Sequence, residues 1–287
     1  MSLSAILLVG LAVLAHLLAD FVFQTDAIAQ AKTATDGRAW RGLAIHTGIV
    51  AVCLLPFVAA YGWRGFEYLV VVSVAHGLID RTKVVLSRRA VRPAERTRSG
   101  GQSEPTDGGV DSPGDRTWTP LPAALFLADQ AAHVVVFIGG ASAILLGQPL
   151  LAEWRSAMGP IGNVLPVAHP QVALAVIVIL VDLAIINIRG GLFLVGTLLA
   201  PRGVGLDPGP ARVGAAIGVL ERLIVCALVL AGQAAAIGFV IAAKTLARFR
   251  QLDDRHFAEY YLVGTLASVT LALSTSIVAE AAIRALR

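Results

Sequence analysis

The sequence is poor in charged residues and in cysteine. Charged side chains make up 15% of its 287 residues, whereas hydrophobic ones make up 56%, and the mean hydropathy is +0.76. A chain of this composition cannot hide its apolar surface inside a water-soluble globule, which excludes a soluble enzyme. The two cysteines, Cys53 and Cys226, each lie within an apolar run. This placement indicates buried thiols and not a disulfide or a thiolate metal site.

The beginning of the chain lacks basic residues. The first 31 residues contain no lysine or arginine, and the first apolar run ends at Asp20 instead of a small-residue cleavage site. A secretory signal peptide begins with basic residues and ends at a cleavage site of small residues, so the segment does not have the pattern of a signal peptide. We therefore expect the first helix to stay in the protein as a membrane span.

Long apolar runs predict an all-α fold, a polytopic transmembrane bundle of seven or eight spans. A helix needs about 20 apolar residues to cross a bilayer. The segment 234–247 is shorter, so it is either half of a tight hairpin or a re-entrant piece, which leaves two possible counts. The expected spans are residues 3–23, 42–61, 66–86, 121–147, 171–188, 213–232, 234–247 and 260–283.

Residues 87–119 differ in composition from the rest of the chain. They are rich in Ser, Gly, Pro, Arg and Asp and nearly free of large aliphatic side chains, which predicts a disordered linker. The linker would separate an N-terminal three-helix membrane block (1–86) from a C-terminal membrane block (120–287). A solvated tether is favoured over binding to anionic lipid headgroups, and no specific nucleic-acid partner is expected.

The distribution of basic residues predicts an orientation. Seven of them lie between Arg81 and Arg98, against the single acid Glu95. Because basic loops stay in the cytoplasm, this segment is expected inside and the N-terminus outside, in a bacterial cytoplasmic (inner) membrane. The lipid bilayer is then the expected partner, and the sequence sets no oligomeric state.

Ionisable residues occur in a repeated pattern inside these apolar runs. The pattern is H-x-x-x-D in two expected helices and the reverse in a third, with a lone histidine in a fourth. Each such group costs about 2.5 to 3.5 kcal/mol in the middle of a bilayer, so seven of them indicate a shared purpose. The residues are His16 and Asp20, His76 and Asp80, Asp129 and His133, and His46.

The four-residue spacing places each pair on one helix face. The helix with the reversed motif, expected at 121–147, crosses the membrane in the opposite direction to the other two. Its histidine and aspartate therefore lie in the same order of depth as theirs. The histidines are expected deeper in the membrane, above a layer of aspartates nearer the cytoplasm, and His46 falls in the same half of the bilayer.

Imidazoles mixed with carboxylates predict a divalent transition-metal site of one or two ions. Zinc is the first choice, ahead of Fe, Mn, Ni and Cu. All seven residues are candidate ligands, and Asp20, Asp80 and Asp129 are also candidate catalytic bases. Hydrogen bonding between helices and a metal-free His-Asp proton relay are the alternatives.

Further polar residues flank this set or lie in the C-terminal block. Gln24 and Gln130 are candidates to hydrogen-bond the ligands, whereas snorkelling is favoured for Lys83 over binding of a substrate phosphate. Glu221 and Glu259 are expected to pair with some of Arg222, Lys244 and Arg248, and a cationic recess for an anionic headgroup or substrate is the alternative.

Three segments resemble motifs of a bacterial family of polytopic membrane proteins that is classed as a domain of unknown function. They are HLLADFVFQT (16–25), HGLIDRTK (76–83) and DQAAH (129–133), matching HLLADFxxQ, HxxID and DQxxH. Three C-terminal segments, IGVLERLIV, AIGFVIAAKTLARF and EYYLVGTLAS, are similar to the tail of some members. The placement of His and Asp on helices is also similar to that of bacterial membrane-bound metal-dependent hydrolases, a similarity that assigns no reaction by itself.

These observations lead to three functional hypotheses. The first is a membrane metalloprotein with an intramembrane His/Asp site open to the cytoplasmic leaflet, hydrolysing a membrane-embedded or amphiphilic substrate. The second is a cation or proton transporter or channel that uses the same groups as an ion path. The third is a structural subunit of a membrane complex.

Overall fold

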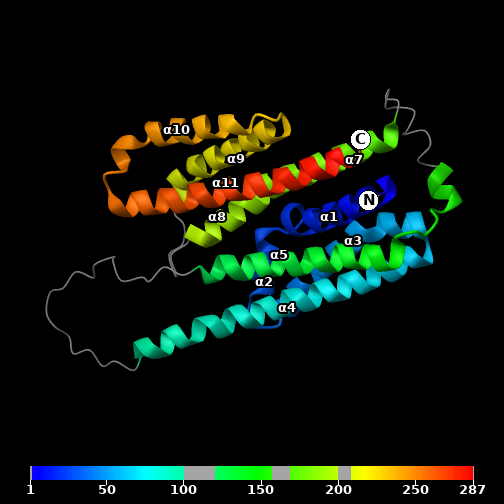
Figure 1. The fold of residues 1–287 in the computed structure, drawn as a ribbon. Helices are drawn as coiled ribbons and strands as arrows, with labels where there is room; N and C mark the ends of the chain where they lie inside the picture. The colour runs from blue at the N-terminus through cyan, green and yellow to red at the C-terminus, as the bar shows by residue number, and fades with distance from the viewer. Residues whose placement is uncertain (1, 100–119, 157–168, 200–207, 287) are drawn as a thin grey trace.

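The structure is a computed structural model that describes residues 2–99, 120–156, 169–199 and 208–286. Within these ranges every regular element is a helix (Figure 1). The principal helices are α1 (Leu3–Leu17), α2 (Asp26–Lys32), α3 (Arg38–Tyr61), α4 (Trp63–Ser99), α5 (Leu121–Gly140), α7 (Pro170–Ile185), α8 (Gly191–Leu199), α9 (Pro208–Leu230), α10 (Ile237–Ala247) and α11 (Arg255–Arg284). Wider π-helical segments extend three of them: η1 (Leu18–Val22), η2 (Ala141–Leu145) and η3 (Ile186–Gly190).

Five helical segments among the described residues are long and apolar enough to cross a membrane. They correspond to five of the eight expected spans, so the chain is an all-helical membrane protein. The runs expected at 66–86, 213–232 and 234–247 are helical too, on α4, α9 and α10, but they are not among these five. The count of seven or eight is therefore not confirmed. The five segments are Leu3–Val22, Arg38–Tyr61, Leu121–Leu145, Pro170–Leu199 and Phe257–Arg284.

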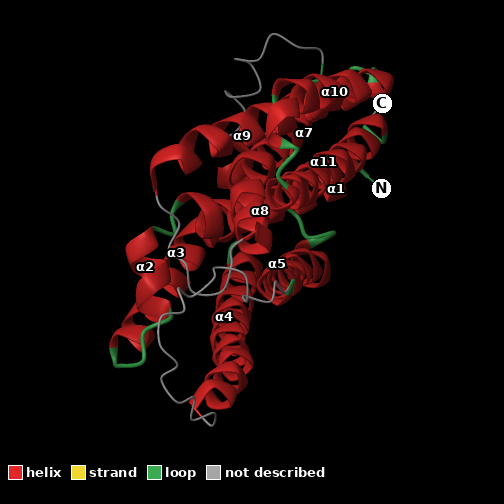
Figure 2. Cartoon of the chain, turned by 90° about the vertical axis from the view of Figure 1, so that its left-hand side faces the viewer, coloured by secondary structure: helices red, strands yellow, loops and turns green. Residues whose placement is uncertain are grey.

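The helices form two groups, one on either side of α1. The first group contains α2 to α5, and the second contains α7 to α11; they occupy the lower and upper parts of Figure 2. Each group has its own buried apolar cluster, and α1 contributes Leu8 and Ala12 to the first and Ile6 to the second. Since α1 packs against both α5 and α7, it joins the two groups.

Helix α4 is longer than expected. It continues to Ser99 and so includes the first part of the segment predicted to be a disordered linker. Arg and Ala are good helix formers, which accounts for the extension. The rest of that segment, residues 100–119, lies outside the described residues.

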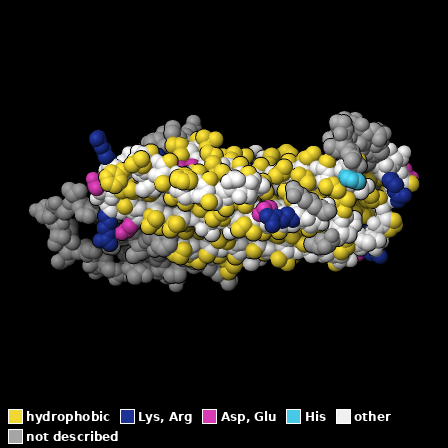
Figure 3. All heavy atoms as spheres, turned by 45° about the horizontal axis from the view of Figure 1, so that its top comes forward, with side chains coloured by type: hydrophobic (Ala, Val, Ile, Leu, Met, Phe, Trp, Pro, Cys, Tyr) yellow, Lys and Arg dark blue, Asp and Glu magenta, His cyan; other side chains and the backbone are white. Residues whose placement is uncertain are grey.

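The surface agrees with a membrane environment. On the face shown in Figure 3, hydrophobic side chains cover most of the middle of the molecule; lysine and arginine lie toward its two ends, apart from one basic patch beside an acidic side chain near the middle. A helical bundle that crosses a bilayer requires such an apolar belt between polar ends.

Candidate metal centre

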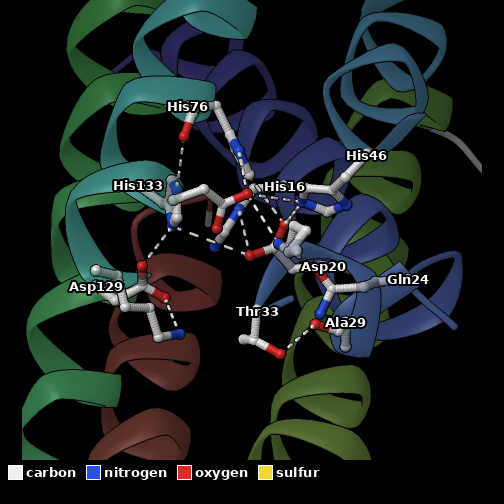
Figure 4. Close-up of polar contacts among 12 residues, drawn as sticks. His16, Asp20, Gln24, Ala29, Thr33, His46, His76, Asp129 and His133 are labelled. Atoms are coloured by element: carbon white, nitrogen blue, oxygen red, sulfur yellow. Dashed lines mark hydrogen bonds and ion pairs between the residues drawn. The ribbon is translucent and has the colours of Figure 1, made fainter. Parts of the chain in front are cut away.

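The seven predicted ligands come together at one place in the N-terminal group. They project from α1 and η1, α3, α4 and α5, and Figure 4 shows the labelled histidines and aspartates turned toward one another. All four histidines are completely buried, and the aspartates nearly so: His16, His46, His76 and His133 are 0% exposed, Asp20 8%, Asp80 5% and Asp129 6%. We refer to these seven residues as the His/Asp cluster.

Asp20 is the centre of the cluster. Its Oδ1 lies 3.0 Å from Nε2 of His76 and 3.2 Å from Nε2 of His46. Its Oδ2 lies 4.0 Å from Nδ1 of both His16 and His133. One carboxylate therefore faces imidazoles from four helices.

A π-helical segment carries Asp20. The first helix begins with a hydrogen bond from the amide of Ala5 to the hydroxyl of Ser2 and widens at Leu18, where η1 begins. The segment closes with a bond of 2.8 Å from the amide of Phe23 to the carbonyl of Leu18. Such wide turns within helices are frequent at functional sites, and no periodicity in the sequence indicates this one.

The other two carboxylates each bind a lysine. Nζ of Lys83 lies 2.7 Å from Oδ2 of Asp129, so the interpretation of Lys83 as a snorkelling side chain is wrong. It turns toward α5 because that helix packs against α4 and presents the buried carboxylate of Asp129 there. Gln130 donates a second bond, of 3.1 Å, to the same oxygen of Asp129.

Lys32 contacts the His/Asp cluster, although the sequence did not indicate it as a site residue. Its Nζ lies 2.8 Å from Oδ2 of Asp80 and 2.7 Å from Oε1 of Gln24. Lys32 ends α2, a short helix packed on α3. Thr25 caps that helix, and the Thr25-Asp26 pair is a helix-start signal that could have predicted α2, although not where its lysine points.

Ligand-type atoms in the cluster lack hydrogen bonds. Both ring nitrogens of His16, Nδ1 of His76 and of His133, and Oδ1 of Asp129 are buried without a hydrogen bond of regular geometry to any described residue. Each buried polar atom left in this state costs about 1–3 kcal/mol, so the set is suited to a ligand that accepts these lone pairs.

Three overlapping sets within the cluster are close enough to hold a metal ion. In each set, one ligand atom per residue lies within 4.8 Å of all the others. Since the sets share His76, His133 and Asp80, they form one continuous site. The sets are His16, Asp20, His76 and His133; His46, His76 and Asp80; and Asp80, Asp129 and His133.

The histidine side of the cluster is closed by apolar packing. The rings of His76 and His133 stack with centroids 3.9 Å apart, and the ring centroid of Phe137 lies 5.1 Å from that of His16. Tyr68 donates a buried hydrogen bond of 3.0 Å to the carbonyl of Phe137, in the core of the N-terminal group. On the aspartate side, Gln24 and Lys83 are partly exposed, so this side of the cluster is closer to the protein surface.

The C-terminal polar residues lie apart from this cluster. Lys244 pairs with Glu221 at 2.6 Å. Glu259 pairs with Arg255 at 2.9 Å, so the expected partners of Glu259 are wrong. Arg255 lies one turn away at the favourable four-residue spacing, which explains the difference. Arg248 donates to Gln251 and contacts neither acid.

The fold and the cluster together define the class of protein: a helical membrane protein with a buried set of histidines and aspartates close enough to hold a metal ion. Residues 7–156, just over half of the chain, match the model of the family described as "Protein of unknown function (DUF3307)", and the chain belongs to this family. The resemblance to a family of unknown function is thus confirmed. No curated protein and no solved structure matches the chain.

Proposed function

We propose that this protein is an integral membrane metalloprotein. Its His/Asp cluster binds one or two divalent transition-metal ions, zinc first, and hydrolyses a membrane-embedded or amphiphilic substrate from the cytoplasmic leaflet. The observation that carries the proposal is the surroundings of Asp20, which faces four imidazoles and pairs with no lysine or arginine of the described residues.

The charge balance supports a bound cation. The cluster and its two lysines contain three carboxylates but only two ammonium groups. Asp20 is the carboxylate left over, and a buried charge without a counter-charge is strongly unfavourable. A divalent ion would supply the missing positive charge, bringing the site from −1 to +1, and would also bind the ring nitrogens that lack partners.

The donor set suits a hydrolytic centre. A divalent ion held by three protein groups with one open position supplies hydroxide from water near neutral pH. His16, His133 and Asp20 would hold such an ion. Asp80 and Asp129, which pair with Lys32 and the partly exposed Lys83, would be the groups that accept a proton from water as it attacks the substrate.

The packing around the cluster favours a site with one entrance over an ion path. A transporter requires a polar route to both faces, whereas the apolar Phe137 and Leu54 belong to the core that adjoins the histidine side of the cluster. The partly exposed Gln24 and Lys83 lie on the aspartate side. Under the orientation predicted from the basic segment, this side is the cytoplasmic one.

Elemental analysis of protein purified in mild detergent without chelator tests the metal. We expect zinc in a fixed ratio of one or two ions per chain, lost in His16→Ala and in His133→Ala. His169→Ala, which removes an exposed histidine outside the cluster, is the control and should retain the metal. A folded wild-type protein that contains no metal would contradict the proposal.

Activity is tested separately, in mixed micelles that contain a phospholipid, an isoprenoid phosphate or a lipopeptide. Stripped protein should be inactive, and added zinc should restore release of one of the hydrolysis products. If instead the metal-loaded protein passes protons or metal ions across proteoliposomes and hydrolyses none of these compounds, the ion-path hypothesis replaces the hydrolase.

A further inference from the structure

Lys83, on the aspartate side of the cluster, has hydrogen-bond donors that its ion pair leaves free. Its Nζ lies 2.7 Å from Oδ2 of Asp129, and its side chain is 34% exposed. A lysine ammonium carries three donors, and Asp129 is its one hydrogen-bond acceptor among the described residues. Lys32, by contrast, is 11% exposed and donates to both Asp80 and Gln24. Lys83 is therefore the lysine of the site that a group from outside can reach.

An aromatic surface begins next to this ammonium. The Nζ of Lys83 lies 5.6 Å from the ring centroid of Phe126 on α5. The ring of Phe126 stacks with that of Phe193 on α8, with centroids 6.5 Å apart. The ring of Phe21 lies 6.4 Å from the first and 6.0 Å from the second. We call these three phenylalanines the aromatic triad. Since Phe21 follows Asp20 in the chain, the triad adjoins the centre of the cluster.

The aromatic triad extends from the interior of the protein to its surface. Phe21 is 5% exposed, Phe126 is partly buried, and Phe193 is 42% exposed. Phe193 belongs to the membrane-spanning segment Pro170–Leu199. An exposed ring on such a segment faces the hydrocarbon of the bilayer. The triad therefore offers a continuous apolar surface between the cluster and the acyl chains of the membrane.

The charge of the site with one ion bound favours a negatively charged substrate. Three carboxylates and two ammonium groups give −1, and one divalent ion brings this to +1. A neutral ester or amide would leave that charge unmatched in a buried place, which is unfavourable. A phosphate group would neutralise it, and phosphate oxygens are strong acceptors for the free donors of a lysine.

We propose that the substrate of this site is a phosphate ester of a lipid, an inference that rests on the proposed metal-dependent hydrolysis. The phosphate accepts hydrogen bonds from Lys83, and the hydrocarbon chain lies along the aromatic triad toward the bilayer. One water is consumed: its oxygen forms a new bond to phosphorus while the ester bond between phosphorus and the alcohol oxygen breaks. The proton that the water gives up ends on the alcohol, so the products are an alcohol and a phosphate.

Product analysis of the zinc-loaded protein in mixed micelles tests the substrate class. Two lipid phosphate esters are compared, farnesyl phosphate and phosphatidylglycerol. Farnesyl acetate and dioleoylglycerol are neutral esters with similar chains, and dimethylallyl phosphate and glycerophosphoglycerol are water-soluble phosphates. We expect cleavage at phosphorus in at least one lipid phosphate and no cleavage of the neutral esters. The matching water-soluble phosphate should have a kcat/KM at least about tenfold lower, because it lacks the chain that the triad binds.

Variants of Lys83 test the contact with phosphate. Lys83→Met should raise KM for the lipid phosphate about tenfold, because charged donors are lost. Lys83→Arg keeps a charge and should raise KM less. Lys244→Met is the matched control: Lys244 also pairs with a carboxylate, at 2.6 Å, but lies outside the cluster. It should leave KM unchanged.

A variant of the aromatic triad tests the contact with the chain. Phe193→Ala should raise KM for the lipid phosphate about fivefold and leave KM for the water-soluble phosphate unchanged, since only the lipid has a chain to lose. Phe239→Ala removes a ring that is 79% exposed on α10 and should have neither effect. Phe193→Ala removes no charge, so it decides the question if Lys83→Met fails to fold.

The failure of this inference differs from the failure of the proposed function. Zinc-dependent cleavage of the lipopeptide or the neutral esters, with the phosphate esters intact, would overturn the substrate class and keep the metal hydrolase. Equal KM values in Phe193→Ala and Phe239→Ala, or in Lys83→Met and Lys244→Met, would also overturn it. A protein that holds no metal, or that holds metal and cleaves none of these compounds, would overturn the proposed function and this inference with it.

Discussion

The two buried polar regions of this protein differ in the sign of the charge that is left unbalanced. In the His/Asp cluster the unmatched group is a carboxylate, Asp20, surrounded by imidazoles. In the C-terminal group it is a guanidinium, that of Arg222 on α9, which donates to the carbonyl of Asn187 and the hydroxyl of Ser268. The comparison teaches that burial identifies a polar region, whereas the sign of the unmatched charge shows which of the two is suited to a cation.

The largest expected effect comes from the centre of the cluster. Asp20→Ala removes the carboxylate that faces all four imidazoles, and it should weaken zinc binding at least about 100-fold, more than loss of a group behind a ligand does. Asp182→Ala is the matched control, since Asp182 is also a buried carboxylate, on α7, but outside the cluster. Competition with a chromophoric chelator measures the zinc affinity of both variants. Similar affinities in the two variants would refute the central role of Asp20.

Removal of the metal should separate the two regions. At zinc concentrations 100 times the dissociation constant, binding stabilises the folded protein by about 2.7 kcal/mol, so a chelator should lower the unfolding midpoint of the wild type. Arg222→Met should respond to the chelator as the wild type does, whereas Asp20→Ala should not respond. A loss of the chelator effect in Arg222→Met would show that the two sites are coupled.

A smaller effect is expected where the two helix groups meet. Nε of Arg189, on η3, donates a 3.0 Å hydrogen bond to the carbonyl of Phe21, next to Asp20 in the chain. Arg189→Met should cost about 1.5 kcal/mol of unfolding free energy, measured with denaturant in mixed micelles. Arg155→Met, which removes an exposed bond to the carbonyl of Leu150, should cost less. A larger loss of unfolding free energy in Arg155→Met than in Arg189→Met would contradict the greater contribution expected of the Arg189 hydrogen bond.

The smallest effect is expected at the ion pair between Lys244 on α10 and Glu221 on α9. Lys244 and Glu221 are 20% and 18% exposed, and a partly solvated pair of this kind contributes about 0.5–1 kcal/mol. Lys244→Met should therefore lower stability slightly and leave zinc affinity unchanged. Arg284→Met, at a pair whose arginine is 71% exposed, should be close to neutral. Altered zinc affinity in Lys244→Met would mean that the two regions are not independent.

The convergence of His16, His76 and His133 could be predicted because it depends on the helical repeat and on the cost of exposing ionisable groups to lipid. The helical repeat places each histidine and its aspartate on one face, and the cost of burial turns those faces inward. The resemblance to a family of unknown function is confirmed by the family match over residues 7–156. The orientation in the membrane and the division at residues 87–119 remain predictions.

The contacts that the sequence did not indicate depend on tertiary structure. Lys32 reaches Asp80 because α2 packs on α3. Arg222 finds a carbonyl acceptor, and main-chain acceptors leave no signal in a sequence. The expected pairing of Glu259 was wrong because Glu259 pairs with an exposed neighbour, Arg255, instead of the residues predicted as its partners.

The two lysines of the cluster have a consequence for the order of events at the site. Lys32 and Lys83 hold Asp80 and Asp129 on the side that leads outward. A second ion, bound by these two carboxylates, would displace both amines, which would then lie unpaired at the entrance. Binding of that second ion would turn an entrance neutralised by its own ion pairs into one that attracts negatively charged molecules.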